Sequence, residues 1–259
     1  MILAILQHIM LFLLGAAISS FLSALAFRIY QEYPVRKMLF QPSHCEKCKT
    51  GLKWFELVPI LSYILQKGKC RNCGKMISPE YFYAEVFLSG TFLIFSILGV
   101  PIINYFVVTM LFFISIFDLL YNQVPRFVMH AVMIMGVIWF LNRVLTGSNS
   151  HGFYLDLYFP VVEAFLWAAL MSFMNLIKKS FGFADILTIL FIGLVSEKML
   201  QPSISFFYGA LILAIPSIFF IIIDPAWRKK YVPFLPFLAI GYVVASLAPD
   251  GIVFTIVSL

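Results

Sequence analysis

Residues 101–120 read PIINYFVVTMLFFISIFDLL, a stretch in which Asp118 is the single charged side chain. A helix that crosses the hydrocarbon core of a bilayer needs about 20 mainly apolar residues and satisfies every backbone polar group within the segment. The whole chain has the same character, because 62% of its 259 residues are hydrophobic and only 12% are charged. The sequence therefore predicts an all-α, polytopic membrane protein.

Further apolar runs flank this stretch on both sides, which predicts a bundle of about eight transmembrane helices. The runs lie at 5–27, 82–99, 101–120, 126–146, 157–177, 183–200, 204–224 and 232–248. The first run lacks a basic start and a small-residue cleavage site, so we interpret it as a helix and not as a signal peptide. We expect a first transmembrane helix at 1–27, a loop domain at 28–80 and a transmembrane domain at 81–259.

The hydrophilic segment 28–80 holds ten basic and four acidic residues, whereas the rest of the chain is neutral. Lys and Arg collect in short cytoplasmic loops, so this segment is predicted to lie inside and the N-terminus outside. Alternation of the spans then puts 178–179 and 228–230 inside, and 147–156 and Lys198 outside. A nucleic-acid surface is the alternative for the charge, but anionic lipid headgroups also attract basic clusters beside a membrane. We expect membrane lipid, and no nucleic acid, as a partner.

All four cysteines lie in this segment as two CxxC pairs, Cys45 with Cys48 and Cys70 with Cys73. Each pair presents two thiolates from one tight turn, and two such turns complete the tetrahedral shell that Zn²⁺ prefers. Disulfides and redox catalysis are the alternatives, although the cytoplasm keeps thiols reduced. His44 stands beside Cys45, but four thiolates already fill the shell. The sequence predicts a structural zinc site.

Acidic residues within or beside membrane spans are costly, which makes each a candidate functional residue. Asp118 ends the third predicted span and Asp185 begins the sixth, so both are expected at the cytoplasmic boundary, at matching depth. Two adjacent carboxylates share a proton, so one activates water while the other protonates the substrate carbonyl. This is aspartic peptidase chemistry. The alternative is that each Asp caps a helix or pairs with a cation such as Arg126.

Two glutamates are less easily assigned. Glu163 falls toward the outer half of its span, where a polar contact between helices suffices to explain it. Glu85 starts the second span, where either the helix dipole or a role beside the zinc loop would account for it.

The order of the loop motifs resembles the prepilin leader peptidase family, over nearly the whole chain. Gly15 and the Ser20–Leu22 triplet, followed by Arg28, resemble the first span of that family. The loop motifs are PSHCEKC at 42–48, PILSY at 59–63 and GKCRNC at 68–73, followed by Tyr81 and Glu85.

The two aspartates also stand in motifs that resemble those of the family. Phe117–Asp118 followed by Val124–Pro125 resembles the first catalytic motif, and Gly182–Asp185, GFAD, resembles the GxGD motif. Ala184 replaces the second glycine, and Leu187 stands where lysine is usual, changes that late-competence members of Gram-positive bacteria tolerate. An alanine Cβ restricts the close approach and the unusual dihedrals that glycine allows.

The resemblance implies a bacterial plasma-membrane endopeptidase that cleaves type IV pilin-like precursors after a glycine, just before their hydrophobic helix. It implies catalytic roles for Asp118 and Asp185, with Gly182, Ala184 and Pro125 in supporting positions. Many members also methylate the new N-terminus with S-adenosylmethionine, but the sequence assigns no residue to that cofactor. The main alternative is a catalytically impaired assembly factor descended from such peptidases. A proton-relay transporter is disfavoured because no internal repeat is evident.

Overall fold

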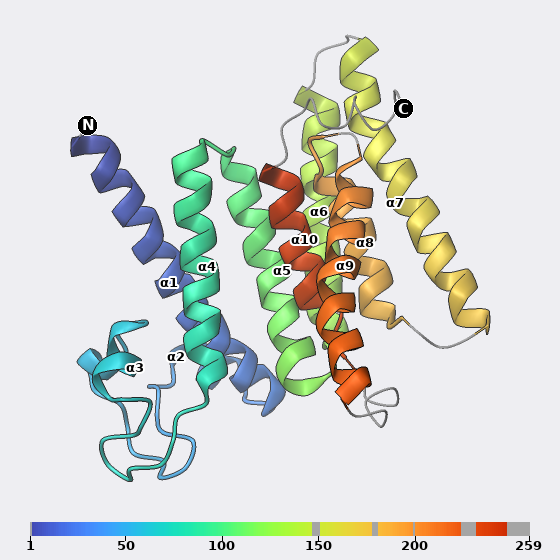
Figure 1. The fold of residues 1–259 in the computed structure, drawn as a ribbon. Helices are drawn as coiled ribbons and strands as arrows, with labels where there is room; N and C mark the ends of the chain where they lie inside the picture. Colours follow the sequence, from blue (N-terminus) through green and yellow to red (C-terminus); the bar gives the residue numbers. More distant parts are fainter. Residues whose placement is uncertain (1, 147–150, 178–180, 199, 224–231, 248–259) are drawn as a thin grey trace. The chain divides into compact units, whose positions relative to one another are not determined.

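The chain is all helical in the computed structural model, which describes residues 2–146, 151–177, 181–198, 200–223 and 232–247 (Figure 1). No β-strand occurs among these residues, so the predicted all-α class is confirmed. The predicted loop positions 147–150, 178–179 and 228–230 lie outside the described residues. The chain forms two compact units, residues 1–101 and 102–259, and each is described by itself.

The first unit contains two long helices and the hydrophilic loop. Its elements are α1 (Ile2–Tyr30), α2 (Val35–Phe40), the 3₁₀ turn η1 (Trp54–Glu56), α3 (Leu61–Leu65) and α4 (Pro79–Leu98). The α1 face that packs on α4 is made largely of small side chains, and a Cβ added at Gly15 would lie 2.9 Å from the Ser89 Cα. Small residues let membrane helices approach closely, which explains this pairing.

The second unit is a bundle of six helices in the part of the chain that is described. They are α5 (Ile102–Tyr121), α6 (Arg126–Thr146), α7 (His151–Ile177), α8 (Phe183–Val195), α9 (Gln201–Ile223) and α10 (Leu235–Leu247). Helix α8 contacts each of the other five, and α10 contacts α5, α8 and α9. Both short helices are largely buried. Two 13-residue helices thus form the centre of this unit.

Glycines allow the closest helix contacts of the second unit. A Cβ at Gly193 would overlap Ala164 of α7, and one at Gly241 would overlap the Ser205 carbonyl oxygen of α9. The backbones of α8 and α7, and those of α10 and α9, therefore approach more closely than any larger side chain would allow.

The eight predicted runs each correspond to a helix, but only part of the set meets the length of a membrane span. Five described helices are long and apolar enough to cross a membrane, whereas the apolar segments 183–195, 201–215 and 235–247 are shorter. The predicted run 183–200 was too long, because α8 ends at Val195 where extended Ser196 and the charged pair Glu197–Lys198 follow. The chain is an integral membrane protein with at least five helices of spanning length.

Candidate active site and metal centre

The two CxxC pairs form turns with the same hydrogen-bond pattern. In the first, the Lys49 N–H donates to the Cys45 carbonyl (2.9 Å) and the Cys45 N–H donates to the Thr50 carbonyl (3.0 Å). In the second, Gly74 donates to Cys70 (2.8 Å), and Cys70 donates to Lys75 (2.9 Å). An isolated antiparallel bridge flanks each turn, at His44–Gly51 and Lys69–Met76. Each turn therefore holds both of its sulfur atoms on one side.

The four Sγ atoms lie within 4.8 Å of one another, and those of Cys45 and Cys73 are 4.0 Å apart. A tetrahedral zinc with Zn–S bonds of about 2.3 Å requires sulfur atoms about 3.8 Å apart. The cluster therefore fits a tetrahedral metal ion with small adjustments. His44 is outside this cluster, and its Nδ1 lies 3.4 Å from the Pro42 carbonyl oxygen.

The pKa values of two of these thiols are shifted in opposite directions. Hydrogen bonds from Thr50 and then Asn72 lower the pKa of Cys48 to about 5. The Lys75 N–H lowers the pKa of Cys73, but burial and the neighbouring thiols outweigh it and raise that pKa to about 11. Four thiolates this close repel one another, so a cation among them is needed if all four are to ionise. The donor set thus suits a divalent metal ion.

Asp118 lies near the C-terminal end of α5 and is 3% exposed. Its Oδ2 accepts a hydrogen bond from the backbone N–H of Leu235 at 3.1 Å, and Leu235 is the first residue of α10. The N-terminus of a helix carries partial positive charge, which stabilises a carboxylate there. Asn122, with a φ of 52°, ends α5 four residues later, and Pro125 directly precedes α6.

Asp185 lies in the first turn of α8 and is 4% exposed. Its Oδ2 accepts a hydrogen bond from the Gly182 N–H at 2.7 Å. Gly182 has φ −76° and ψ 161°, an extended conformation open to any residue, and Ala184 is helical and half-buried. Ala184 thus has an ordinary helical conformation, which an alanine adopts without strain.

Two buried carboxylates thus lie at the starts of two central helices of the second unit. Asp118 is held at the N-terminus of α10 and Asp185 at that of α8, and α8 contacts both α5 and α10. The charge of Asp118 acts electrostatically on the Asp185 carboxyl group. Such a pair is able to share a proton and to divide the roles of base and acid.

The structure connects Glu85 to the loop and Glu163 to a neighbouring helix. The Glu85 Oε2 accepts the Ile60 N–H at 2.6 Å, which favours the role beside the zinc loop over the helix-dipole explanation. The Glu163 Oε1 accepts the Ser203 N–H of α9 at 3.1 Å, the polar contact between helices that the sequence predicts.

Ile60 has a strained backbone. Its φ of 63° and ψ of −56° form a γ-turn, in which the Leu61 N–H donates to the Pro59 carbonyl at 2.6 Å. This conformation is rare and strained, above all for a β-branched side chain. The Glu85 carboxylate therefore fixes a turn that the chain would not adopt by local preference.

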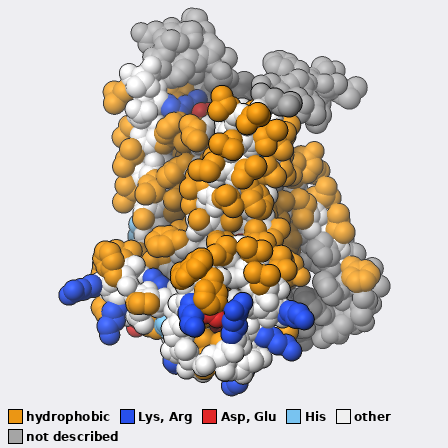
Figure 2. Space-filling view, turned by 90° about the vertical axis from the view of Figure 1, so that its left-hand side faces the viewer, with side chains coloured by type: hydrophobic (Ala, Val, Ile, Leu, Met, Phe, Trp, Pro, Cys, Tyr) orange, Lys and Arg blue, Asp and Glu red, His pale blue; other side chains and the backbone are white. Residues whose placement is uncertain are grey.

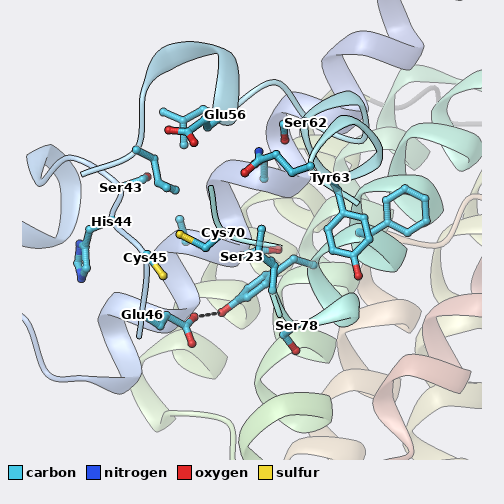
Figure 3. Close-up of a pocket in the computed structure, with 18 of the residues that line it drawn as sticks. Ser23, Ser43, His44, Cys45, Glu46, Glu56, Ser62, Tyr63, Cys70 and Ser78 are labelled. Carbon is cyan, nitrogen blue, oxygen red and sulfur yellow. Dashed lines mark hydrogen bonds between the residues drawn. The ribbon is translucent and has the colours of Figure 1, made fainter. Parts of the chain in front are cut away.

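A cavity of about 600 Å³ lies within the first unit, between α1, the loop and the start of α4 (Figure 3). Its polar lining includes Glu46, Glu56 and Glu85. The Tyr81 hydroxyl donates to Glu46 at 2.7 Å, the hydrogen bond drawn in Figure 3. Sequence reasoning missed this cavity, because its members are spread over 66 positions, from Ser20 to Glu85.

Arg28 and Ser23 also line this cavity, and the sequence did not indicate their contacts. The Arg28 guanidinium is buried and donates to the Met38 and Gln41 carbonyl oxygens, so it fastens the loop to α1. Ser23 is 4% exposed, and its buried Oγ has no hydrogen-bond partner among the residues that the structure describes. No sequence signal distinguishes Ser23 from the other small residues of α1 that pack against a neighbouring helix.

The comparisons with known proteins agree with these features. Residues 13–98 match the bacterial peptidase A24 N-terminal domain family. The chain is 28% identical over 251 residues to the prepilin leader peptidase/N-methyltransferase of Bacillus subtilis (strain 168), a match that covers 94% of this chain and 95% of that protein. The protein of the same name from Aeromonas salmonicida (strain A449) is 24% identical over 216 residues, 81% of this chain and 72% of that protein.

A shorter match concerns a third relative. The prepilin leader peptidase/N-methyltransferase of Vibrio cholerae is 33% identical over 115 residues, which are 42% of this chain and 45% of that protein. No solved structure shows a significant match. The resemblance to this family is confirmed.

Proposed function

We propose that this chain, a relative of the prepilin leader peptidase/N-methyltransferases, is a membrane aspartic endopeptidase that removes the leader of type IV pilin-like precursors. The cut falls after a glycine, just before the hydrophobic helix of the precursor. Asp118 and Asp185 form the catalytic pair: one carboxylate deprotonates a water and the other protonates the scissile carbonyl. Gly182, Ala184 and Pro125 shape the turns that carry the pair.

One observation carries this proposal: the buried carboxylates of Asp118 and Asp185 are each held by a backbone N–H at or just before the start of a different central helix. A structural capping role would need no second carboxylate close enough to interact electrostatically. The names of the relatives supply the substrate class and the second activity.

The test is leader cleavage by purified protein. Asp118→Asn and Asp185→Asn each keep the size of the side chain but lose the acid–base group, so we expect cleavage to fall at least about a hundredfold. Glu163→Gln changes another buried carboxylate, outside the pair, and should retain cleavage. Full cleavage by either Asn variant would refute the catalytic pair. A wild-type protein that fails to cleave any precursor would favour the alternative, an impaired assembly factor.

The proposal extends to the loop and to the placement of the chain. Cys45, Cys48, Cys70 and Cys73 bind one structural zinc ion. The loop 28–80 and both aspartates face the cytoplasm, and the basic loop lies against anionic lipid. Figure 2 shows most of the Lys and Arg side chains of the displayed face gathered at its lower end, while hydrophobic side chains predominate above them. S-adenosylmethionine, when bound, supplies a methyl group to the new N-terminal amine.

A further inference from the structure

The loop of the first unit contains an apolar segment that neither the catalytic pair nor the metal centre uses. Residues 54–66 read WFELVPILSYILQ, in which Glu56 is the only charged side chain. The segment forms η1 and α3, within the hydrophilic stretch 28–80. An apolar run of this length is too short to span a membrane, and such runs form either a buried core helix or an interfacial segment. The exposure of its side chains decides between the two.

Helix α3 exposes its apolar residues and covers its polar ones. Leu61, Ile64 and Leu65 are 52%, 56% and 63% exposed, and the helical repeat of about 100° per residue puts them on one face. Ser62, and Gln66 directly after the helix, instead line the cavity of the first unit. A domain surrounded by water buries its aliphatic side chains, so α3 has the reverse arrangement. The outer face of α3, which consists of Leu61, Ile64 and Leu65, therefore suits an apolar medium.

Contacts with α4 hold α3 in place. The Ile60 N–H, at the start of α3, donates to the Glu85 carboxylate at 2.6 Å, and the Tyr63 ring stacks on Phe82 with centroids 5.0 Å apart. The Phe82 ring also contacts Tyr83, at a centroid distance of 5.7 Å, and Tyr83 is exposed. Helix α3 thus lies beside the lower end of α4 in Figure 1, and a row of rings connects it to the exposed surface of that helix.

The level of α3 in the membrane follows from the length of α4. With 20 residues, α4 is about 30 Å long, which is the thickness of the hydrocarbon core. A helix that spans the core therefore places its first two turns, which carry Phe82 and Glu85, at the edge of the hydrocarbon. Because α3 is attached to these two residues, its outer face lies at the same level.

The side chains around the outer face are those that favour a membrane–water boundary. Trp54, in the adjacent η1 turn, is 79% exposed, and tryptophan is enriched at the level of the lipid headgroups. Lys53 and Lys67, directly before and after the segment, are also exposed. Their ammonium groups can reach anionic headgroups while the aliphatic stems stay beside apolar chains. An apolar face with a cationic border is complementary to a bilayer that contains anionic lipid.

We propose that residues 54–65 form an interfacial anchor, in which the outer face of α3 and Trp54 insert at the boundary between lipid headgroups and acyl chains. The Glu85 carboxylate fixes the strained turn at Ile60 and thereby directs the outer face toward lipid. This goes beyond attraction between basic side chains and headgroups, because apolar insertion attaches the loop independently of salt. The anchor involves neither the catalytic pair nor the methyl transfer, so it is tested separately from the proposed function.

The test is quenching of tryptophan fluorescence in full-length protein reconstituted into vesicles of phosphatidylcholine and phosphatidylglycerol. Ile64→Trp places a reporter on the outer face, and the signal of the four native tryptophans is subtracted. An interfacial helix is buried about 5–10 Å into the boundary, so lipids with a nitroxide near the top of the acyl chain should lower the added fluorescence at least about twofold. Acrylamide, which quenches from water, should have little effect.

Two further variants complete the experiment. Trp54→Phe tests the anchor without a new side chain in α3, and it should remove a lipid-quenched part of the wild-type signal. Gly51→Trp is the matched control, because it adds the same reporter to the same loop outside the segment, where a Cβ meets nothing within 4 Å. Acrylamide, and not the nitroxide lipids, should quench its added fluorescence. Equal zinc content and thermal midpoints in all variants show that the loop remains folded.

Concentrated salt separates insertion from charge attraction. At about 1 M ionic strength the screening length falls to about 3 Å, which removes most of the attraction between exposed charges. The lipid quenching of Ile64→Trp should persist under these conditions. Loss of that quenching would leave charge attraction as the only contact and would overturn the anchor.

The other outcomes are equally decisive. Quenching of Ile64→Trp by acrylamide alone would place the outer face in water. Protection from both quenchers would mean that protein, from another part of the chain or from a second copy, covers this face. Either result would overturn the anchor. Failure of leader cleavage in the same vesicles would bear on the proposed function alone, since no quenching result depends on catalysis.

Discussion

Lys49 and Gly74 occupy equivalent positions, one residue after each CxxC pair, and both have a positive φ, of 59° and 69°. Glycine adopts this conformation freely, whereas other residues lose roughly 1–2 kcal/mol. Lys49→Gly should therefore slow the loss of zinc to a chelator, and Gly74→Ala should accelerate it. Metal analysis of the wild type should find about one zinc per chain.

Gly51 provides the control for this pair of variants. It lies in the same loop, its φ is not positive, and a Cβ there would meet nothing within 4 Å. Gly51→Ala should therefore release zinc at the wild-type rate. If it released zinc as fast as Gly74→Ala, backbone conformation would not be the cause.

Single residues were predictable from the sequence where they belong to a motif of known chemistry. The spacing of the cysteines indicated a metal cluster, and the structure brings Cys45, Cys48, Cys70 and Cys73 together. The partner of Asp118 was not predictable, because Leu235 contributes only its backbone N–H and lies 117 positions away. The strained turn at Ile60 also has no sequence signal, since nothing in a β-branched residue suggests a positive φ.

Among the helices, the contact between α9 and α10 leaves no room for a side chain at Gly241. A Cβ there would overlap the Ser205 carbonyl oxygen and approach the Gly209 nitrogen to 2.8 Å. Backbone atoms cannot move aside as a flexible side chain would, so Gly241→Ala should cost about 1–3 kcal/mol of stability. The thermal midpoint of the full-length protein in detergent measures this loss.

Gly90 of α4 shows what the same substitution does where space is available. Nothing lies within 4 Å of a Cβ at Gly90, and alanine is favoured over glycine in a helix by about 1 kcal/mol. Gly90→Ala should therefore leave the midpoint unchanged or raise it. Equal destabilisation by both variants would contradict the packing argument.

The positions of the helices were largely predictable, because each apolar run became a helix. The lengths of the helices, and which helices pack against one another, were not predictable. Hydropathy alone extended the sixth run to residue 200, although α8 ends at Val195. Which helices form the centre depends on close contacts such as that between Gly193 and Ala164, and a single sequence does not reveal which glycines face a neighbour.

For the chain as a whole, the charge distribution predicts its orientation in the membrane. The loop carries seven exposed lysines: Lys37, Lys47, Lys49, Lys53, Lys67, Lys69 and Lys75. If the loop is cytoplasmic, a membrane-impermeant amine reagent should label these lysines in lysed cells and not in intact protoplasts. Mass spectrometry of the purified protein gives the labelled positions.

Lys198 serves as the internal control, because the predicted orientation places it on the outer side. It is half-buried, so we expect it to react more slowly than an exposed lysine. Labelling of the loop lysines in intact protoplasts would reverse the orientation. Labelling of Lys198 alone in intact protoplasts would support it.

The short central helices also bear on how the protein is made. With 13 residues, α8 is about 20 Å long, well below the roughly 30 Å of the hydrocarbon core, and the described part of α10 has the same length. A segment this short is poorly suited to leave the translocon for lipid by itself. The ribosome delivers α5, α6 and α7 before α8, and α8 contacts all three. Helix α10 follows last and contacts α5, α8 and α9, so in each case protein surfaces replace lipid around the later helix. Biogenesis of the second unit therefore ends in a cooperative assembly step, in which the last helices enter a scaffold of protein that has already been inserted.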